Sequence, residues 1–141
     1  MIYDTLHIAC TALGARLFTI MIQFPSAGVA RRAYTSHPVE YPTSGTKLLT
    51  RDGWYDHVIA GKQTFVANTP PEFACYFNDH ALITALGLGS CANLPVIHDA
   101  AVLGTVNLLA EAGHFTPAKL LAYRALFQTH HAALVDEMAK A

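Results

Sequence analysis

The segment that most restricts the fold is residues 16–24, which read RLFTIMIQF. From residue 17 onward its even-numbered positions are Phe, Ile, Ile and Phe, whereas its odd-numbered positions are Leu, Thr, Met and Gln. Alternation with a period of two is typical of a β-strand. A strand that is also half apolar on its second face is covered on both sides. The sequence therefore predicts that this strand is central in a sheet with material packed on each face.

The other elements alternate without a regular repeat, and turn residues or helix caps separate them. The pattern predicts a helix over residues 2–13, strands over 29–36, 63–67, 90–97 and 103–109, a short helix capped by Thr50, a helix over 69–83 broken near Asp79, and a long helix after Thr116. Residues 37–49 read as an ordered loop. No strand–helix–strand unit recurs regularly, so the order favours an α+β fold with a largely antiparallel sheet and helices on both faces.

Composition excludes several classes of protein. The chain of 141 residues is 52% hydrophobic and 13% charged, which predicts one folded domain over residues 1–141 and some apolar surface covered by a partner. Its net charge is −1 and its nine Lys and Arg residues are scattered, so we expect no nucleic-acid partner. The apolar run from Leu17 to Ile22 is too short to span a bilayer, so we expect no membrane partner.

The cysteines are not spaced like those of a disulfide-bonded protein, and the histidines are not spaced like metal ligands. Cys10, Cys75 and Cys91 are far apart in the sequence, which predicts free thiols in a reducing compartment and therefore a cytoplasmic location. No two of the eight histidines stand three or four residues apart with a carboxylate. We therefore expect no metal site.

The C-terminal half carries an ordered set of motifs. Leu94-Pro95-Val96 precedes a polar link, then come Leu103–Leu109, His114-Phe115-Thr116 and an amphipathic helix. This order resembles the C-terminal half of a GAF domain, with Gly104, Val106 and Leu108 in the positions of its G-x-L-x-L strand and Val in place of the first Leu. Upstream, the aromatic helix at Trp54-Tyr55 and the passage from Phe65 to Pro70 also match. The resemblance covers nearly the whole chain, and the order of the motifs carries it.

The resemblance implies a GAF/PAS-like central antiparallel sheet with the terminal helices together on one face and a cavity over the other. In the family this cavity holds cyclic nucleotides, tetrapyrroles, haem, small acids or phenolic effectors. Members are usually sensory modules attached to an output domain, for which 141 residues leave no room. We therefore expect a stand-alone small-molecule sensor that works alone or through a separate output protein. The sequence identifies neither the ligand nor any cofactor.

A dimer is also expected, because the terminal helices of the family commonly pair with a second subunit. The apolar stripe that would form this interface comprises Leu120, Phe127, Leu134 and Met138 together with Ile2 and Leu6. Within each helical segment the members stand seven or four residues apart, which places them on one face of a helix.

Strand parity selects the central ligand-binding candidates, Asn93 and Asn107 on neighbouring strands, with Cys91 on the same face as Asn93. A buried carboxamide without a partner is costly. Each amide should therefore be hydrogen-bonded by protein, water or a ligand, and the two interpretations are that it pairs with turn or loop backbone or that it binds a polar group of a ligand. The other candidates are Trp54, Tyr55 and Phe77 on the helices over the cavity, Tyr34, Ser36 and Tyr41 as a polar rim, and His80 at the edge of the roof.

Two alternatives to a sensor remain open on the sequence. One branch of GAF-like proteins reduces free methionine sulfoxide with cavity cysteines, and Cys91 and Cys75 fall in the corresponding half of the chain. The acidic segments that surround the cysteines of that branch are missing here. The second alternative is a dimeric interaction module without a ligand. A non-enzymatic role is favoured, although the sequence does not decide whether a reaction is catalysed.

Overall fold

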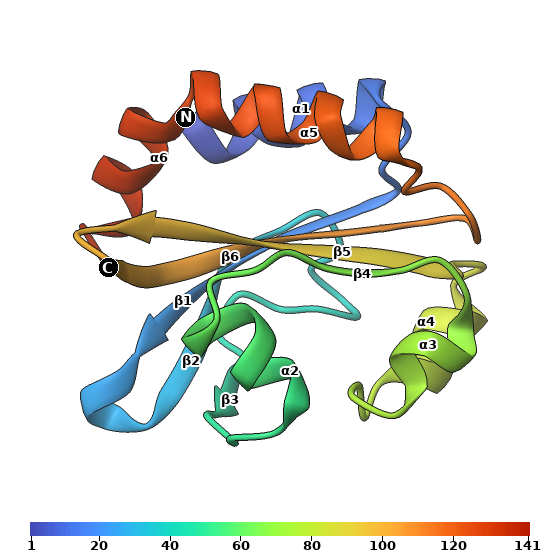
Figure 1. The fold of residues 1–141 in the computed structure, drawn as a ribbon, viewed down its shortest axis with the longest axis horizontal. Coiled ribbons are helices and arrows are strands. Elements are labelled where there is room, and N and C mark those ends of the chain that lie inside the picture. Colours follow the sequence, from blue (N-terminus) through green and yellow to red (C-terminus); the bar gives the residue numbers. More distant parts are fainter.

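A six-stranded antiparallel sheet forms the middle of the molecule in the computed structural model, which describes residues 1–141 (Figure 1). The strands are β1 (Leu17–Phe24), β2 (Val29–Thr35), β3 (Thr46–Leu48), β4 (Phe65–Ala67), β5 (Ser90–His98) and β6 (Ala101–Ala110), in the spatial order β3-β2-β1-β6-β5-β4. The predicted central strand is β1, which pairs with β2 on one side and β6 on the other. The predicted α+β fold is confirmed.

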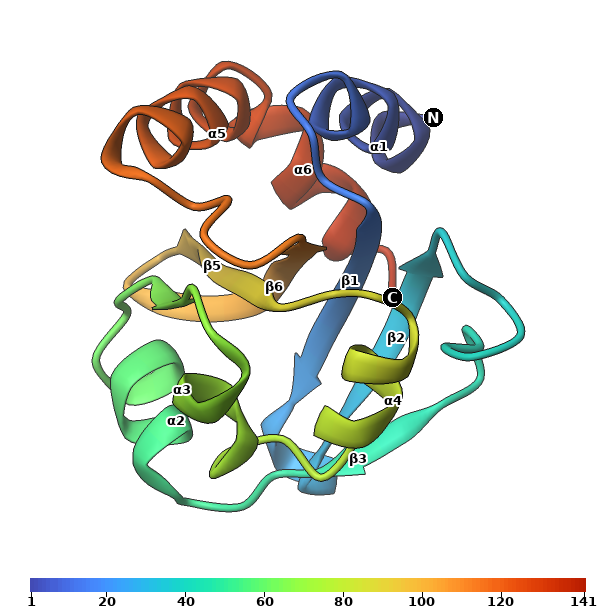
Figure 2. The same cartoon turned by 90° about the vertical axis from the view of Figure 1, so that its right-hand side faces the viewer.

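Helices cover the two faces of the sheet in separate groups (Figures 1 and 2). The terminal helices α1 (Ile2–Ala12), α5 (Pro117–Thr129) and α6 (His131–Met138) lie together on one face, as predicted. The opposite face carries α2 (Gly53–Tyr55) with a π-helical turn over Asp56–Ala60, α3 (Pro70–Ala74) and α4 (His80–Ala85). None of these helices has the length and apolar character needed to cross a membrane.

The alternation in β1 produces two hydrophobic cores. Phe18, Ile20 and Ile22 join a cluster of 17 buried residues beneath the terminal helices. Leu17 points the other way and joins a cluster of 8 buried residues, which includes Phe73. The second cluster is smaller because polar side chains interrupt that face of the sheet, and the candidate site lies there.

The hairpin of β5 and β6 fixes the register of the sheet. Asp99 and Ala100 have φ values of 51° and 62° and make the turn, as the polar link predicted. Gly104 lies where the backbones of β6 and β1 approach each other closely. A Cβ at this position would stand 2.1 Å from the carbonyl oxygen of Met21. Only glycine fits this position, and the glycine of the G-x-L-x-L motif therefore has a packing reason.

Two of the predicted boundaries are wrong. The predicted loop 37–49 contains β3, which pairs with β2. Its residues are exposed and do not alternate between apolar and polar, so the sequence does not indicate a strand there. The cap of α2 is Asp52 and not Thr50, because the Asp52 Oδ1 accepts a hydrogen bond from the Tyr55 backbone N at 2.8 Å.

The predicted long C-terminal helix is two helices. At His130 the backbone leaves the helical region, with φ of −102° and ψ of 13°. This bend turns α6 toward the sheet, so that Leu134 and Met138 are buried against β5 and β6 while α5 stays beside α1. The break predicted near Asp79 is confirmed, because α3 ends at Ala74 and α4 begins at His80.

Candidate ligand-binding site

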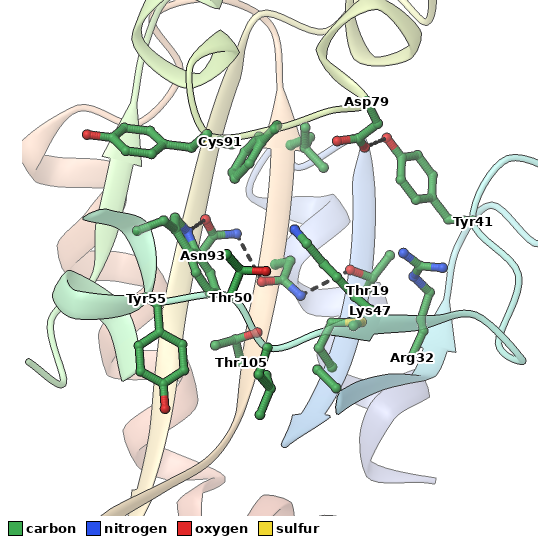
Figure 3. A pocket seen from close by; sticks show the side chains of 18 of the residues that line it. Thr19, Arg32, Tyr41, Lys47, Thr50, Tyr55, Asp79, Cys91, Asn93 and Thr105 are labelled. Atoms are coloured by element: carbon green, nitrogen blue, oxygen red, sulfur yellow. Dashed lines mark hydrogen bonds between the residues drawn. The ribbon is translucent and has the colours of Figure 1, made fainter. Parts of the chain in front are cut away.

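A cavity of about 150 Å³ lies between the sheet and the group of helices α2 to α4 (Figure 3). Its floor is the sheet face that the terminal helices leave free. The floor residues come from the three central strands and are Leu17, Thr19, Met21, Gln23, Cys91, Asn93, Thr105, Asn107 and Leu109. The walls and roof include Ala30, Arg32, Tyr41, Lys47, Asp52, Trp54, Tyr55, Tyr76, Phe77, Asp79 and Ile83.

A chain of side-chain hydrogen bonds crosses the floor. The Trp54 Nε1 donates to the Asn93 Oδ1 at 2.9 Å, and the Asn93 Nδ2 donates to the Asn107 Oδ1 at 2.9 Å. The Asn107 Nδ2 donates in turn to the Thr19 Oγ1 at 3.2 Å. Register explains the chain, because Asn107 stands directly opposite both Asn93 and Thr19.

The amides of Asn93 and Asn107 are only 7% and 8% exposed. The expected protein partners are present, but they are side chains and not turn or loop backbone, since each amide bonds to the other and to Trp54 or Thr19. Each amide uses one of its two N–H donors in this chain. The network therefore satisfies most of the buried polar groups and still leaves donor capacity at the floor.

Arg32 lies at the side of the cavity, beneath the ring of Tyr41 (Figure 3). Its guanidinium carbon is 5.1 Å from the centroid of that ring, and its Nη1 donates to the Pro42 carbonyl at 3.0 Å. Its Nε is buried without a hydrogen-bond partner. Burial lowers the pKa of the Arg32 guanidinium, and the nearby Tyr41 and Asp79 oppose that shift.

Lys47 reaches into the cavity from the edge strand β3 (Figure 3). Its Nζ lies 5.9 Å from the ring centroid of Trp54 and 6.0 Å from that of Phe77. Both distances are at the outer range of cation–π contacts. The Lys47 ammonium forms neither an ion pair nor a side-chain hydrogen bond, so the aromatic faces are its only specific neighbours.

The two carboxylates of the lining are already engaged by other groups. The Tyr41 hydroxyl donates to the Asp79 Oδ2 at 2.5 Å, and burial together with this bond raises the pKa of Tyr41. Asp52 caps α2 through the Tyr55 backbone N. Neither acid forms an ion pair with Arg32 or Lys47. The cavity thus has two cations without an anionic partner.

Most of the residues selected from the sequence meet at this cavity. Asn93, Asn107, Trp54, Tyr55, Tyr41, Phe77 and Cys91 all line it. The roof comes from the two helical segments that were expected to supply it, α2 and the pair α3–α4 (Figure 2). Their role in binding a ligand stays a prediction.

Tyr34 does not line the cavity, and a β-bulge is the reason. Ile20 pairs with Tyr34 while Met21 pairs with Arg32, so Ala33 has no partner in β1. The extra residue reverses the faces of β2. Tyr34 therefore packs under the terminal helices, where its hydroxyl donates to Asp4 at 3.1 Å.

Ser36 and His80 also lie outside the cavity. The Ser36 Oγ accepts a hydrogen bond from the Phe18 backbone N at 2.9 Å and lies 2.7 Å from the His37 Nδ1, so it ends the strand. His80 is exposed at the first turn of α4, and the preceding residue, Asp79, is the one that lines the cavity. The position of the helix break explains this shift by one residue.

Sequence reasoning missed Arg32, Lys47, Asp79, Thr19 and Gln23 as lining residues. Thr19 and Gln23 did leave a signal, because they are the polar positions on the second face of the central strand. The Gln23 Oε1 is a second buried atom without a hydrogen-bond partner. Arg32 has the same parity as Tyr34, so the bulge is needed to tell which of the two faces the cavity, and Lys47 could not be found without the short strand β3.

The cysteine arrangement does not assemble a reactive pair. Cys91 lines the cavity but is 1% exposed, and burial raises the pKa of its thiol to about 12. A thiol with so high a pKa is protonated at neutral pH and is a poor nucleophile. Cys75 is exposed and is not part of the lining. No group of three or more His, Cys, Asp or Glu side chains converges as a metal site would require.

The chain is an α+β domain in which an antiparallel sheet carries the terminal helices on one face and a cavity beneath short helices on the other. The family model of the GAF domain matches residues 1–139. The chain belongs to the GAF domain family. Among curated proteins, none matches the sequence.

Solved structures with this fold include three GAF domains of low sequence identity. The GAF domain/HD domain protein from Geobacter sulfurreducens has a TM-score of 0.75 at 14% identity, over 98% of this chain and 91% of that one. The GAF domain of a two-component sensor histidine kinase from Bacillus halodurans gives 0.74 at 11%, over 96% and 92%. The GAF domain of a phosphoenolpyruvate-protein phosphotransferase from Coxiella burnetii gives 0.73 at 17%, over 98% and 82%.

Proposed function

We propose that this GAF domain binds a small molecule in the cavity above Asn93 and Asn107 and acts as a homodimeric sensor. The observation that carries the proposal is the hydrogen-bonded chain of Trp54, Asn93, Asn107 and Thr19 on the floor of a cavity. An ordinary core would use apolar residues at these positions. A ligand pocket instead combines apolar walls with a few fixed polar groups.

The size and chemistry of the cavity support a ligand. An apolar cavity of roughly 150 Å³ holds a molecule such as benzene. Here the lining adds two buried atoms without partners, the Arg32 Nε and the Gln23 Oε1. Such atoms are destabilising unless water or a ligand bonds to them.

The sensory part of the proposal draws on the family. One structural neighbour is the GAF domain of a sensor histidine kinase, in which the domain is part of a signalling protein. We propose that this chain passes a change at its cavity to a separate output protein. Its three free cysteines, Cys10, Cys75 and Cys91, suit the reducing cytoplasm, which is the location that we propose.

The proposed homodimer uses the outer face of the terminal helices. Part of the stripe expected from the sequence is unavailable, because Leu6, Leu134 and Met138 are buried in the core of the monomer. The exposed apolar side chains of this layer are Ile8 on α1 and Leu121 on α5, at 72% and 71% exposure. The two helices lie side by side (Figure 2), so these residues can form one interface.

Native mass spectrometry of freshly purified protein tests the binding function, followed by a thermal-shift screen of metabolites. A ligand that binds only the folded state adds about 2.7 kcal/mol at a hundredfold excess over its dissociation constant. Thr105→Leu places a larger apolar side chain on the floor and should reduce the shift of any hit. Val102→Leu, in the same strand but outside the cavity, should leave the shift unchanged.

Two results would reject the proposal. One is that no bound mass and no thermal shift is found across the screen. The other is that Thr105→Leu and Val102→Leu retain equal shifts, which would place the ligand elsewhere. The first result would favour a dimeric interaction module that needs no ligand.

A further inference from the structure

We propose that the ligand is a small aromatic carboxylate, whose carboxylate binds between Arg32 and Lys47 and whose ring lies against Trp54 and Phe77. This inference rests on the proposed function of the cavity and adds the class of ligand. Its starting point is the two cations that lack an anionic partner at one wall of the cavity.

The register of β2 and β3 places Arg32 and Lys47 close enough for one anion to contact both side chains. Lys47 in β3 stands opposite Ala30 in β2, and Arg32 is two residues further along β2 on the same face. Diagonal neighbours of this kind are about 7–8 Å apart at the backbone, which long side chains can bridge. One carboxylate can therefore contact a guanidinium and an ammonium at the same time.

No group of the protein supplies that carboxylate. Asp79 accepts a hydrogen bond from the Tyr41 hydroxyl, and Asp52 caps the first turn of α2. The Arg32 Nε has no acceptor at all. A ligand carboxylate would give the guanidinium a bidentate partner, which is its preferred geometry.

The aromatic part of the ligand follows from what surrounds the Lys47 ammonium. That group now lies between the rings of Trp54 and Phe77, at 5.9 and 6.0 Å from their centroids. Figure 3 shows the Lys47 side chain extending across the cavity from β3. A ligand ring would replace the ammonium against these two faces, and the ammonium would move to the carboxylate. The volume of about 150 Å³ suits one six-membered ring with a small substituent.

Calorimetric titration with sodium benzoate, and with benzamide as its uncharged counterpart, tests the inference. Wild-type protein should bind benzoate about tenfold or more tightly than benzamide, because only benzoate makes charge-assisted hydrogen bonds. Arg32→Gln and Lys47→Gln should each weaken benzoate binding by about 10- to 100-fold and leave benzamide binding nearly unchanged.

Matched controls remove the same charge elsewhere. Arg31→Gln alters the residue that precedes Arg32 in β2. Arg31 is exposed, stacks on Phe24 and does not line the cavity. Lys62→Gln alters a second exposed lysine outside the cavity. Both should bind benzoate like the wild type, and circular dichroism of all four variants checks that each is folded.

The possible results separate this inference from the proposed function. Equal binding of benzoate and benzamide would overturn the carboxylate and leave the cavity as a binding site. Unchanged benzoate binding in both Arg32→Gln and Lys47→Gln would also overturn it, because the anion would then lie elsewhere. Failure of benzoate to bind would overturn it too, while a bound mass in the native spectrum would still support the proposed function.

Discussion

Asn93 and Asn107 stand opposite each other across β5 and β6, and the Asn93 Nδ2 donates to the Asn107 Oδ1 at 2.9 Å. The pair connects the indole of Trp54 on one side to the hydroxyl of Thr19 on the other. Because both amides are buried, loss of one leaves the other without its partner.

A double-mutant cycle on this pair should show strong coupling. Asn93→Leu and Asn107→Leu should each lower the free energy of unfolding by about 1–3 kcal/mol, since each leaves a buried amide unpaired. The double variant should lose less than the sum of the two single losses. Urea denaturation measures all four proteins, and additive losses would show that the two amides act independently.

Gln23→Met should stabilise the ligand-free protein. The Gln23 Oε1 is buried without a donor, and methionine has a similar length and no polar atom. We expect a gain of about 1 kcal/mol in the free energy of unfolding. An unchanged or lower melting temperature would mean that water already satisfies this oxygen.

Alkaline pH should destabilise the fold through buried thiols. Burial raises the pKa of Cys91 from 9.0 to about 12, and that of Cys10 likewise. Between these values the unfolded chain loses the thiol protons while the folded chain keeps them. The unfolded state then binds fewer protons, so stability falls as pH rises, by up to about 1.4 kcal/mol per pH unit for each thiol.

Cys91→Ala tests this directly, because it removes one of the two thiols. Its free energy of unfolding should decline less steeply than that of the wild type between pH 9 and 12. Cys75→Ala is the matched control, because that thiol is exposed and should leave the slope unaltered. Equal slopes in the two variants would argue against a buried, protonated Cys91.

Leu121→Glu should weaken the proposed dimer. It places a charge on the outer face of α5, where Leu121 is 71% exposed and folding does not depend on it. Sedimentation at micromolar concentration should show a dimer for the wild type and a larger monomer fraction for the variant. Val39→Glu adds the same charge at another exposed residue, outside the helices, and should leave the dimer intact. A monomeric wild type would reject the dimer.

Local alternation predicted the floor of the cavity well. Parity along two strands put Asn93 and Asn107 on single faces. Those faces coincide because Leu103 is a bulge after the turn at Asp99: Ile97 pairs with Val102 and Val96 with Gly104, which brings Asn93 opposite Asn107. The central position of β1 followed in the same way from its two apolar faces. The alternation along each strand depends on neighbouring residues, which a sequence displays, whereas the bulge at Leu103 does not show in it.

The charged wall was not predictable because it depends on backbone irregularities. The regular register from the hairpin places Arg32 opposite Met21 on the cavity face, and the bulge at Ala33 then sends Tyr34 to the other face, although the pattern of β2 shows no interruption. Lys47 comes from a three-residue edge strand whose side chains are all exposed. Neither feature changes hydrophobic periodicity, which was the signal that sequence reasoning used.

Trp54 is the single tryptophan of the chain, and it is bonded to the floor of the cavity. Its fluorescence therefore reports on that one place with no background from a second indole. A molecule that displaces the Lys47 ammonium or breaks the bond to Asn93 changes the surroundings of the ring and so its emission. The protein thus contains its own optical probe, and occupancy can be followed in solution without a label.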